Sequence, residues 1–153
     1  KAGQRILVTG AAGAVGTYAV QLAKAAGAHV IASASDASSE HVLARGADEV
    51  IAPITGDASD VTVEPVDVLL NLAPIEPDVF VTLGRLVRDG GRGIDMYDAS
   101  DAEQLAGLVA RIDAGDLTVD VARRVPLAEL AAVHAAAADG TLKGKVVIVP
   151  DAW

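Results

Sequence analysis

The chain contains no cysteine among its 153 residues. Without thiols it can form neither disulfide bonds nor zinc sites with thiolate ligands. Aromatic residues are also scarce, at 3% of the sequence, whereas 52% of the residues are hydrophobic. The core must therefore be built from Ala, Val, Leu and Ile, a composition typical of buried parallel strands covered by alanine-rich helices.

Positive charge is in short supply as well. The formal net charge is −9, and 12 Lys and Arg residues stand against 21 Asp and Glu residues with no basic cluster to offset them. Such a field repels nucleic acid, so we expect no nucleic-acid partner. An anionic cofactor is still compatible with it, because backbone N–H groups at the start of a helix bind phosphate locally.

The longest uncharged run extends from Ile6 to Ala23. It reaches only the lower limit of length for a membrane span, and its internal Gly10, Gly13 and Gly16 favour a short strand, a turn and a helix instead. We therefore expect no association with a membrane. The sequence begins at Lys1 on a strand-like segment with neither an initiator Met nor a signal pattern, which suggests a piece of a longer protein.

Strand and helix patterns alternate along the chain. We predict strands at 4–9, 29–33, 49–51, 66–72, 93–97, 117–125 and 145–149, and helices at 14–26, 38–45, 77–87, 101–114 and 127–139. One long loop, Ala52 to Pro65, separates the third and fourth strands. This alternation predicts an α/β fold, specifically a Rossmann-type, doubly wound parallel sheet with helices on both faces.

Two of the predicted helices carry an apolar stripe. The first stripe consists of Val15, Ala19, Leu22, Ala23 and Ala26, and the stripe of helix 101–114 consists of Leu105, Leu108, Val109 and Ile112. The residues of each stripe lie on one face of their helix. Gly27 follows the first helix at the position where a left-handed residue ends a helix.

The segment with the clearest chemical meaning is Val8-Thr-Gly-Ala-Ala-Gly-Ala-Val-Gly16, between the first strand and the first helix. It matches a dinucleotide-binding fingerprint in which alanine replaces the first glycine. The glycines allow a tight turn and a close approach to a diphosphate, and the free N–H groups at the helix start would face that diphosphate. The predicted binding residues are Gly10, Ala11, Ala12, Gly13, Ala14, Val15 and Gly16.

The end of the second strand bears on the choice between NAD and NADP. A domain specific for NAD usually carries Asp or Glu there, bound to the ribose 2′-hydroxyl, but the corresponding position is Ala34. The missing acid leaves room for a 2′-phosphate, with Ser33 and Ser35 as hydrogen-bond donors. No Lys or Arg follows closely and Asp36 is an unfavourable neighbour, so NADP(H) is favoured over NAD(H) without excluding it.

Several segments resemble one enzyme family. They are Gly3-Gln-Arg-Ile-Leu-Val-Thr-Gly-Ala-Ala-Gly-Ala-Val-Gly16, Gly46-Ala-Asp-Glu-Val50, Asp67-Val-Leu-Leu-Asn71, Leu86-Val-Arg-Asp-Gly-Gly91, and Pro126-Leu-Ala-Glu-Leu130 followed by His134 and Gly144-Lys-Val-Val147. Together they make the chain similar to the medium-chain dehydrogenase/reductase superfamily, in particular to its zinc-free quinone oxidoreductase (zeta-crystallin-like) branch. The resemblance implies NADPH-dependent reduction of quinones or activated double bonds, with hydride passing from C4 of the nicotinamide.

The resemblance also implies a domain division and a second part of the site. Residues 1–115 would form the NAD(P)-binding Rossmann domain, and residues 116–153 a segment that in the family packs against a GroES-like catalytic domain. The backbone around Asn71, Leu72 and Ala73 would lie beside the nicotinamide ribose. Nothing in this sequence represents the catalytic domain, so the segment's apolar faces would be partly exposed and we expect a homo-oligomer.

Besides the catalytic domain, the sequence departs from the family's pattern elsewhere. The loop Ala52 to Pro65 replaces a helix, and the region after Gly91 is shortened. The lysine that often contacts the 2′-phosphate in the family would fall near Ser38 or Ser39, which carry no positive charge.

Other enzyme classes fit less well. An extended short-chain dehydrogenase shares the fingerprint but needs a Tyr-x-x-x-Lys pair, and here Tyr18 is followed by Leu22 and Tyr97 by Asp101. A zinc alcohol dehydrogenase would need a ligand set that three scattered histidines cannot supply, so we expect no metal. A module that binds NADP(H) without turnover and a Rossmann domain with a vacant turn remain alternatives.

The acids Asp98, Asp101 and Glu103 stand near a helix start, where they are expected to compensate the helix dipole rather than to catalyse. No catalytic residue is therefore predicted in this chain. The function that we predict is cytoplasmic, NADPH-dependent hydride transfer to a small molecule such as a quinone or an enone. This chain would supply the cofactor-binding half, and the substrate pocket would come largely from elsewhere.

Overall fold

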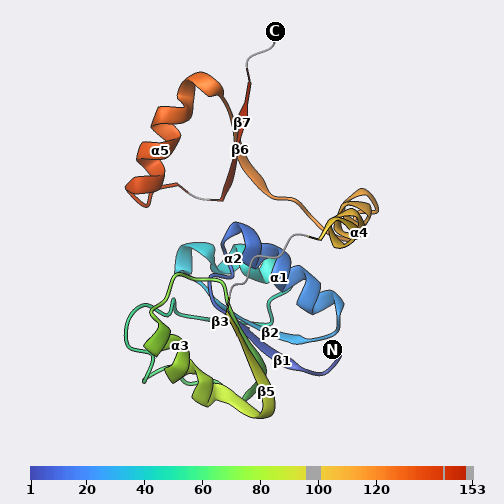
Figure 1. Cartoon of the computed structure of the whole chain (residues 1–153), viewed down its shortest axis with the longest axis vertical. Coiled ribbons are helices and arrows are strands. Elements are labelled where there is room, and N and C mark those ends of the chain that lie inside the picture. Colours follow the sequence, from blue (N-terminus) through green and yellow to red (C-terminus); the bar gives the residue numbers. More distant parts are fainter. Residues whose placement is uncertain (96–100, 143, 151–153) are drawn as a thin grey trace. The chain divides into compact units, whose positions relative to one another are not determined.

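The computed structural model describes residues 1–95, 101–142 and 144–150. The chain divides into two compact units, Lys1–Leu117 and Thr118–Trp153. The prediction of a parallel α/β sheet is confirmed in the first unit (Figure 1). Its five strands have the spatial order β3-β2-β1-β4-β5, and every neighbouring pair is parallel.

The strands and helices of the first unit alternate, except that a loop and no helix joins β3 to β4. They are β1 (Arg5–Val8), α1 (Ala14–Ala25), β2 (His29–Ser33), α2 (Asp36–Ala44), β3 (Glu49–Ile51), β4 (Val66–Asn71), α3 (Pro77–Leu83), a 3-10 turn η1 (Gly84–Leu86), β5 (Val87–Asp95) and α4 (Ala102–Asp113). The uncharged run that begins at Ile6 is thus divided among a strand, a turn and a helix, as predicted. In the described part of the chain, no helix is both long and apolar enough to cross a membrane.

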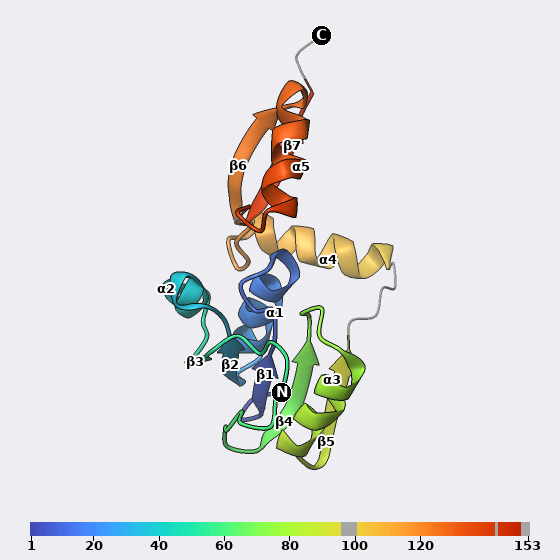
Figure 2. The same ribbon diagram turned by 90° about the vertical axis from the view of Figure 1, so that its left-hand side faces the viewer.

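Two apolar clusters cover the two faces of this sheet. Leu7, Ile31 and Leu69 face one cluster, which also contains Val79 and Leu83 of α3. The other cluster joins alternate residues of the same strands to α1 and α2. Figures 1 and 2 accordingly show α1 and α2 on one side of the sheet and α3 on the other, so the sheet is doubly wound.

The loop from Ala52 to Pro65 takes part in the core although it forms neither helix nor strand. Ile54 and Ala58 are buried in the cluster on the α3 side. The guanidinium of Arg85 holds the loop in place, since its Nη2 donates to the carbonyl oxygens of Ala58, Ser59 and Val61 at 2.9, 2.6 and 2.7 Å. The loop therefore covers the face that a helix would otherwise cover.

The predicted stripe on the first helix is partly wrong. Gly16, Thr17 and Val20 are the buried residues of α1, whereas Val15 is 57% exposed and Ala26 lies beyond the helix end. The close approach of the helix to the turn at Gly10 and Ala11 requires Gly16 to face that turn, which rotates Val15 towards solvent. The predicted left-handed glycine after this helix is confirmed, with a φ of 78° at Gly27.

The predicted boundary around Gly90 and Gly91 is also wrong. The helix predicted at 77–87 ends earlier, and β5 begins at Val87 rather than at Gly93. The glycine pair lies inside the strand, where the pairing of β5 with β4 shifts register, so it marks an irregularity and not a strand boundary. The predicted strand end at Tyr97 lies outside the described residues.

The second unit contains β6 (Val121–Pro126), a 3-10 turn η2 (Leu127–Glu129), α5 (Leu130–Ala138) and β7 (Lys145–Val149). Its two strands pair in parallel and form a sheet of their own. Strand β6 begins at Val121, whereas the predicted strand began at Leu117. The strand predicted at 145–149 is confirmed.

Candidate functional site

The glycine-rich turn joins the end of β1 to the start of α1. Gly10 adopts a φ of 62°, and the N–H of Gly13 donates to the carbonyl oxygen of Gly10 at 3.0 Å. Helix α1 then begins at Ala14, with Gly13 as its N-cap residue. The turn is tight because a left-handed glycine reverses the chain directly after the strand.

Two of the glycines are required by close packing. A Cβ atom at Gly16 would lie 2.1 Å from the carbonyl oxygen of Gly10, and one at Gly10 would lie 2.8 Å from the carbonyl oxygen of Leu72. At Gly13 a Cβ atom would meet only the Gly10 oxygen, at 3.2 Å. Gly10 and Gly16 are therefore needed by the fold, whereas Gly13 mainly keeps the outer surface of the turn open.

The start of α1 fits an anionic group. The first turn of the helix contains no acidic residue, and the N-cap glycine makes no side-chain hydrogen bond. The N–H groups of the first helical residues have no partner within a helix, and Ala14 and Val15 are exposed. A turn whose outer surface Gly13 keeps open, next to exposed residues at the positive end of a helix dipole, fits a diphosphate.

A buried hydrogen-bond network joins the carboxyl ends of β1 and β4. The hydroxyl of Thr9 donates to Oδ1 of Asn71 and accepts from the N–H of Leu72 at 3.1 Å. Oδ1 of Asn71 also accepts from the N–H of Ala73 at 3.3 Å. Thr9 and Asn71 are 1% and 3% exposed, so the network fixes the backbone of Leu72 and Ala73 beside the glycine turn.

Asp95 extends this network to β5, and neither it nor Thr9 was among the predicted site residues. Its Oδ1 accepts a hydrogen bond from Nδ2 of Asn71 at 2.8 Å. A polar residue at the end of a predicted strand is the signal that could have identified it. That signal was obscured because the strand was predicted at 93–97, which placed Asp95 in its interior and not at its end.

The two serines at the end of β2 have different environments. Ser33 is buried, and its hydroxyl donates to the carbonyl oxygen of Ala52 and accepts from the N–H of Ile54, both at 3.2 Å. Ser35 is exposed as the N-cap residue of α2, and its hydroxyl lies 3.2 Å from that of Ser38. Ser33 thus holds the 52–65 loop, whereas Ser35 faces solvent with Ser38. Ala34 between them is buried.

The structure places all the predicted binding residues at one edge of the sheet. Gly10 to Gly16 follow β1, Ser33 to Ser35 end β2, and Asn71 to Ala73 end β4. Strand β1 lies between β2 and β4, so the chain changes direction across the sheet at this point. Ligands of open α/β sheets bind at such a switch point, outside the carboxyl ends of the strands.

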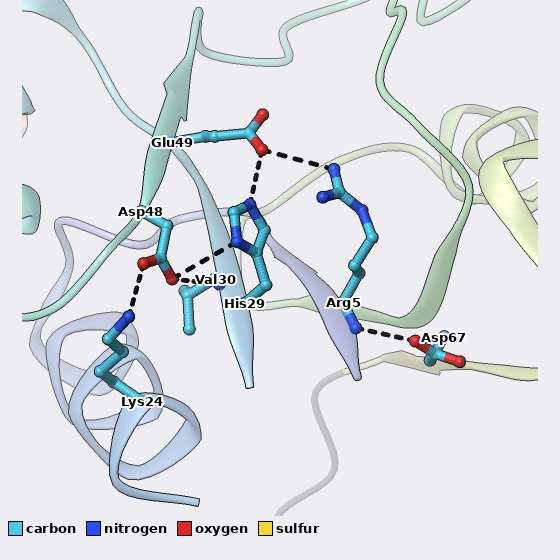
Figure 3. Close-up of polar contacts among 7 residues, drawn as sticks. All are labelled: Arg5, Lys24, His29, Val30, Asp48, Glu49 and Asp67. Atoms are coloured by element: carbon cyan, nitrogen blue, oxygen red, sulfur yellow. Dashed lines mark hydrogen bonds and ion pairs between the residues drawn. The ribbon is translucent and has the colours of Figure 1, made fainter. Parts of the chain in front are cut away.

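The opposite edge, where the strands begin, carries a network of ion pairs (Figure 3). Nζ of Lys24 lies 2.5 Å from Oδ1 of Asp48, and Nε2 of His29 lies 2.5 Å from Oε1 of Glu49. Arg5 contacts the same Glu49 oxygen at 3.4 Å. The network links the starts of β1, β2 and β3, and it gives His29 a structural role.

The pKa values of the two carboxyl groups in this network are lowered. Burial by itself would raise the pKa of Asp48, but hydrogen bonds from Lys24 and from the N–H of Val30 outweigh it. The pKa of Glu49 is lowered first by the hydrogen bond with His29 and further by Arg5, against a smaller effect of burial. Both carboxylates therefore stabilise the folded chain as anions.

The described residues form no evident metal-binding site. Within residues 1–95, 101–142 and 144–150, no group of three or more His, Asp or Glu side chains is placed to hold a metal ion. The first predicted helix-start acid, Asp98, lies outside these ranges. Asp101 caps α4, because its Oδ1 accepts from the N–H groups of Glu103 and Gln104 at 3.0 and 2.9 Å.

The sheet order and the glycine turn define a dinucleotide-binding domain of the Rossmann type. A family model described as zinc-binding dehydrogenase matches residues 14–94, more than half of the chain, and a second model with the same description matches residues 96–148. The chain belongs to this family, which is part of the medium-chain dehydrogenase/reductase superfamily. The superfamily predicted from the sequence is thus confirmed.

Curated relatives and solved structures agree with this assignment. The chain is 40% identical over 113 residues to the spectinabilin polyketide synthase system protein NorB of Streptomyces orinoci, covering 70% of this chain and 5% of that protein. It is 53% identical over 49 residues to the mitochondrial NAD(P)H oxidoreductase RTN4IP1 of Mus musculus, covering 32% of this chain and 12% of the relative.

Among solved structures, the quinone oxidoreductase from Coxiella burnetii has a TM-score of 0.83 at 25% identity, covering 97% of this chain and 53% of that one. The structure of AibC has a TM-score of 0.84 at 27% identity, covering 99% of this chain and 50% of that one. The chain therefore spans about half the length of these structures and a smaller part of the curated relatives.

Proposed function

We propose that this chain is the cofactor-binding half of an NADPH-dependent oxidoreductase that transfers hydride to a quinone, an enone or a similar activated double bond. Ala11 to Gly16 would hold the diphosphate, Ser33 to Ser35 the adenosine end, and Asn71 to Ala73 the nicotinamide side. The observation that carries the proposal is the tight glycine turn at the start of α1, whose outer surface Gly13 keeps open and which contacts the carboxyl end of β4 at Gly10.

The nicotinamide would supply the hydride, and the residues of this chain would position it. Catalysis of hydride transfer depends largely on holding donor and acceptor close together in a dry cleft. In this chain the buried network of Thr9 and Asn71 gives the backbone of Leu72 and Ala73 a fixed position for that purpose. The similarity to proteins named NAD(P)H oxidoreductase and quinone oxidoreductase supports the same substrate class.

A preference for NADP(H) is supported by the end of β2. Ala34 provides no carboxylate for a ribose 2′-hydroxyl, and the exposed Ser35 and the half-buried Ser38 lie at the N-terminus of α2, where a 2′-phosphate would be favoured. Ser33 is buried and its hydroxyl proton is donated to Ala52, whereas Ser35 is exposed, so Ser35 is the more accessible of the two. Asp36 in the first turn of α2 would limit the preference.

We further propose that hydride transfer proceeds without a zinc ion held by this chain. The sequence has no cysteine, and His29 is engaged with Glu49 at the edge opposite the glycine turn. The remaining donor set does not suit a tetrahedral zinc site. Elemental analysis of the purified chain tests this, and stoichiometric zinc that survives dialysis would contradict it.

We also propose that the chain self-associates and acts in the cytoplasm on a small molecule. Leu105 and Val109 of α4 are 62% and 47% exposed although they belong to the predicted apolar stripe, and adjacent exposed apolar residues favour association. Analytical ultracentrifugation at increasing concentration should show a dimer or larger species.

Cell fractionation tests the proposed cytoplasmic location of the protein.

Calorimetric titration with NADPH, and separately with NADH, tests the central proposal. Binding of NADPH with weaker binding of NADH would support both the cradle and the preference. If neither binds, the cofactor-binding function is wrong for this chain. Steady-state oxidation of NADPH by a quinone then separates an enzyme from a module that only binds the cofactor.

A further inference from the structure

Asp95 is the last residue of β5, and it is paired in register with Asn71, the last residue of β4. Side chains at paired positions of neighbouring parallel strands point to the same side of the sheet. Nδ2 of Asn71 accordingly donates to Oδ1 of Asp95 at 2.8 Å. Asn71 is almost fully buried. Its side-chain amide therefore presents either its nitrogen or its oxygen to the Asp95 carboxylate.

The contact with Asp95 determines which way the Asn71 amide faces. An ionised carboxylate only accepts hydrogen bonds, so the nitrogen of the amide must point towards Asp95. The amide oxygen is thereby directed to the Thr9 hydroxyl and to the N–H of Ala73. In the reversed orientation, the amide nitrogen would face the Ala73 N–H, and two donors would oppose each other.

We infer that Asp95 is a positioning residue of the cofactor site, which acts through Asn71 to fix the backbone of Leu72 and Ala73. This inference rests on the proposed function, because it assigns a role at the nicotinamide side of the proposed site. Asp95 itself need not contact the cofactor. Its effect passes through the Asn71 amide to the backbone at the end of β4.

The packing of the glycine turn makes this backbone sensitive to small shifts. A Cβ atom at Gly10 would lie within 3.0 Å of both the carbonyl oxygen of Leu72 and the N atom of Ala73. The glycine turn and the end of β4 are therefore in close contact. A ligand that extends across both should respond to a change at Asp95, whereas a ligand confined to the end of β2 should not.

The test compares NADPH with adenosine 2′,5′-bisphosphate, which represents the adenosine end alone. We expect Asp95→Ala in the 153-residue chain to weaken NADPH binding by about tenfold, as expected for loss of one charge-assisted hydrogen bond. Binding of the bisphosphate should be unchanged. Asp95→Asn should stay within about threefold of the original chain, because an amide oxygen can still accept from Asn71. Asp89→Ala, which removes the same charge near the other end of β5, is the matched control.

An exchange of the two side chains separates positioning from simple stability. Asn71→Asp alone places two carboxylates against each other and should weaken NADPH binding and lower the Tm. Combined with Asp95→Asn, it restores a donor and an acceptor in swapped order, and the carboxylate introduced on β4 can still accept from Thr9 and Ala73. The double variant should therefore recover NADPH affinity relative to Asn71→Asp.

The outcomes are distinct. Equal NADPH affinity for Asp95→Ala and the original chain would overturn the inference while leaving the proposed function intact. An equal loss for NADPH and the bisphosphate, or no recovery in the double variant, would also overturn it, because either result indicates a general structural effect. An original chain that binds neither ligand would overturn the proposed function and this inference with it.

Discussion

At the residue scale, Gly13 and Gly16 belong to the same turn but differ in their surroundings. A Cβ atom at Gly16 would be enclosed by the backbone of Gly10 and Ala11, whereas one at Gly13 would have a single neighbour within 4 Å, and Gly13 is exposed. The fingerprint assigns Gly13 to the close approach of the diphosphate and Gly16 to close packing of the helix. The structure separates a glycine that the fold requires from one that it does not.

We expect Gly13→Val to abolish measurable NADPH binding with little change in Tm. The added side chain would project from the surface where the diphosphate is proposed to lie, and its Cβ would meet the protein only at the Gly10 oxygen. Calorimetry and thermal unfolding measure the two effects. Unchanged affinity would contradict the proposed site.

The matched variant Gly16→Val should instead destabilise the fold. Its Cβ would overlap the Gly10 oxygen and lie 2.6 Å from Cα of Ala11, so the turn would have to open, at a cost of about 3 kcal/mol or more. Chemical denaturation gives the free energy of unfolding. A Gly16→Val chain as stable as the original would show that the turn is more adaptable than its geometry indicates.

The buried hydroxyl of Thr9 supports a second residue-scale prediction. Thr9→Val keeps the shape but leaves the N–H of Leu72 without its acceptor, which should lower the free energy of unfolding by about 1–3 kcal/mol. Thr62→Val provides the control, since Thr62 is exposed and its hydroxyl donates to the nearby Asp60 carbonyl oxygen. Urea denaturation of both variants makes the comparison, and equal effects would contradict a special role for the buried hydroxyl.

At the element scale, the 52–65 loop shows how an irregular segment can cover a sheet. It buries Ile54 and Ala58 and is tied to η1 by one guanidinium. A loop fixed by few contacts should open locally before the sheet unfolds. Arg85 is therefore the residue on which its order depends most.

We expect Arg85→Gln to increase hydrogen exchange and proteolysis within residues 55–63 while the strands stay protected. A glutamine is shorter than an arginine and carries no charge, so its amide nitrogen should not replace the three hydrogen bonds that Nη2 of Arg85 donates. Arg123→Gln in β6 is a suitable control, because Arg123 is exposed and its ion pair with Glu129 is long, at 3.9 Å. Loss of protection throughout the sheet would mean that the loop unfolds together with the sheet.

The ion pairs at the starts of β1 to β3 predict a pH dependence of stability. A carboxyl group whose pKa is lower in the folded than in the unfolded chain adds stability above its unfolded pKa, and this is lost as the pH falls through the folded pKa. Because the pKa values of Asp48 and Glu49 are both lowered, stability should decline as the pH drops below their ordinary values of 3.8 and 4.5. Equilibrium unfolding from about pH 7 to about pH 3 should show a shallower decline for Asp48→Asn. An identical slope would show that this network contributes little.

At the scale of the whole molecule, the two units differ in how much core they possess. Nearly all the buried hydrophobic residues belong to Lys1–Leu117, and in the described part of the second unit only Val125 is buried. A two-stranded sheet with one short helix cannot bury enough apolar surface to be stable alone. We therefore expect the second unit to be unstable on its own.

We expect a peptide of residues 118–153 to be largely unfolded in water, whereas residues 1–117 should retain α/β structure and unfold cooperatively. Circular dichroism with thermal unfolding of both fragments measures this. A cooperative transition in the 118–153 peptide would contradict the prediction. Failure of the 1–117 fragment to fold would show that its sheet requires the rest of the chain.

Much of this architecture could be predicted from the sequence because it depends on local patterns. The strands at 29–33 and 49–51, the glycine after α1 and the turn from Gly10 to Gly16 each depend on the properties of a few neighbouring residues. Alternation of strands and helices then restricts the fold to a parallel sheet. The family followed from the same segments, and the match over residues 14–94 confirms it.

Tertiary structure decided what depends on neighbours distant in sequence. The start of β5 depended on pairing with β4, which accommodates Gly90 and Gly91 inside the strand. The buried face of α1 was set by its close contact with the β1 turn rather than by hydrophobicity. The contact of Thr9, Asn71 and Asp95 arises only where β1, β4 and β5 end together, because register between strands is fixed by the whole sheet and not by any local sequence pattern.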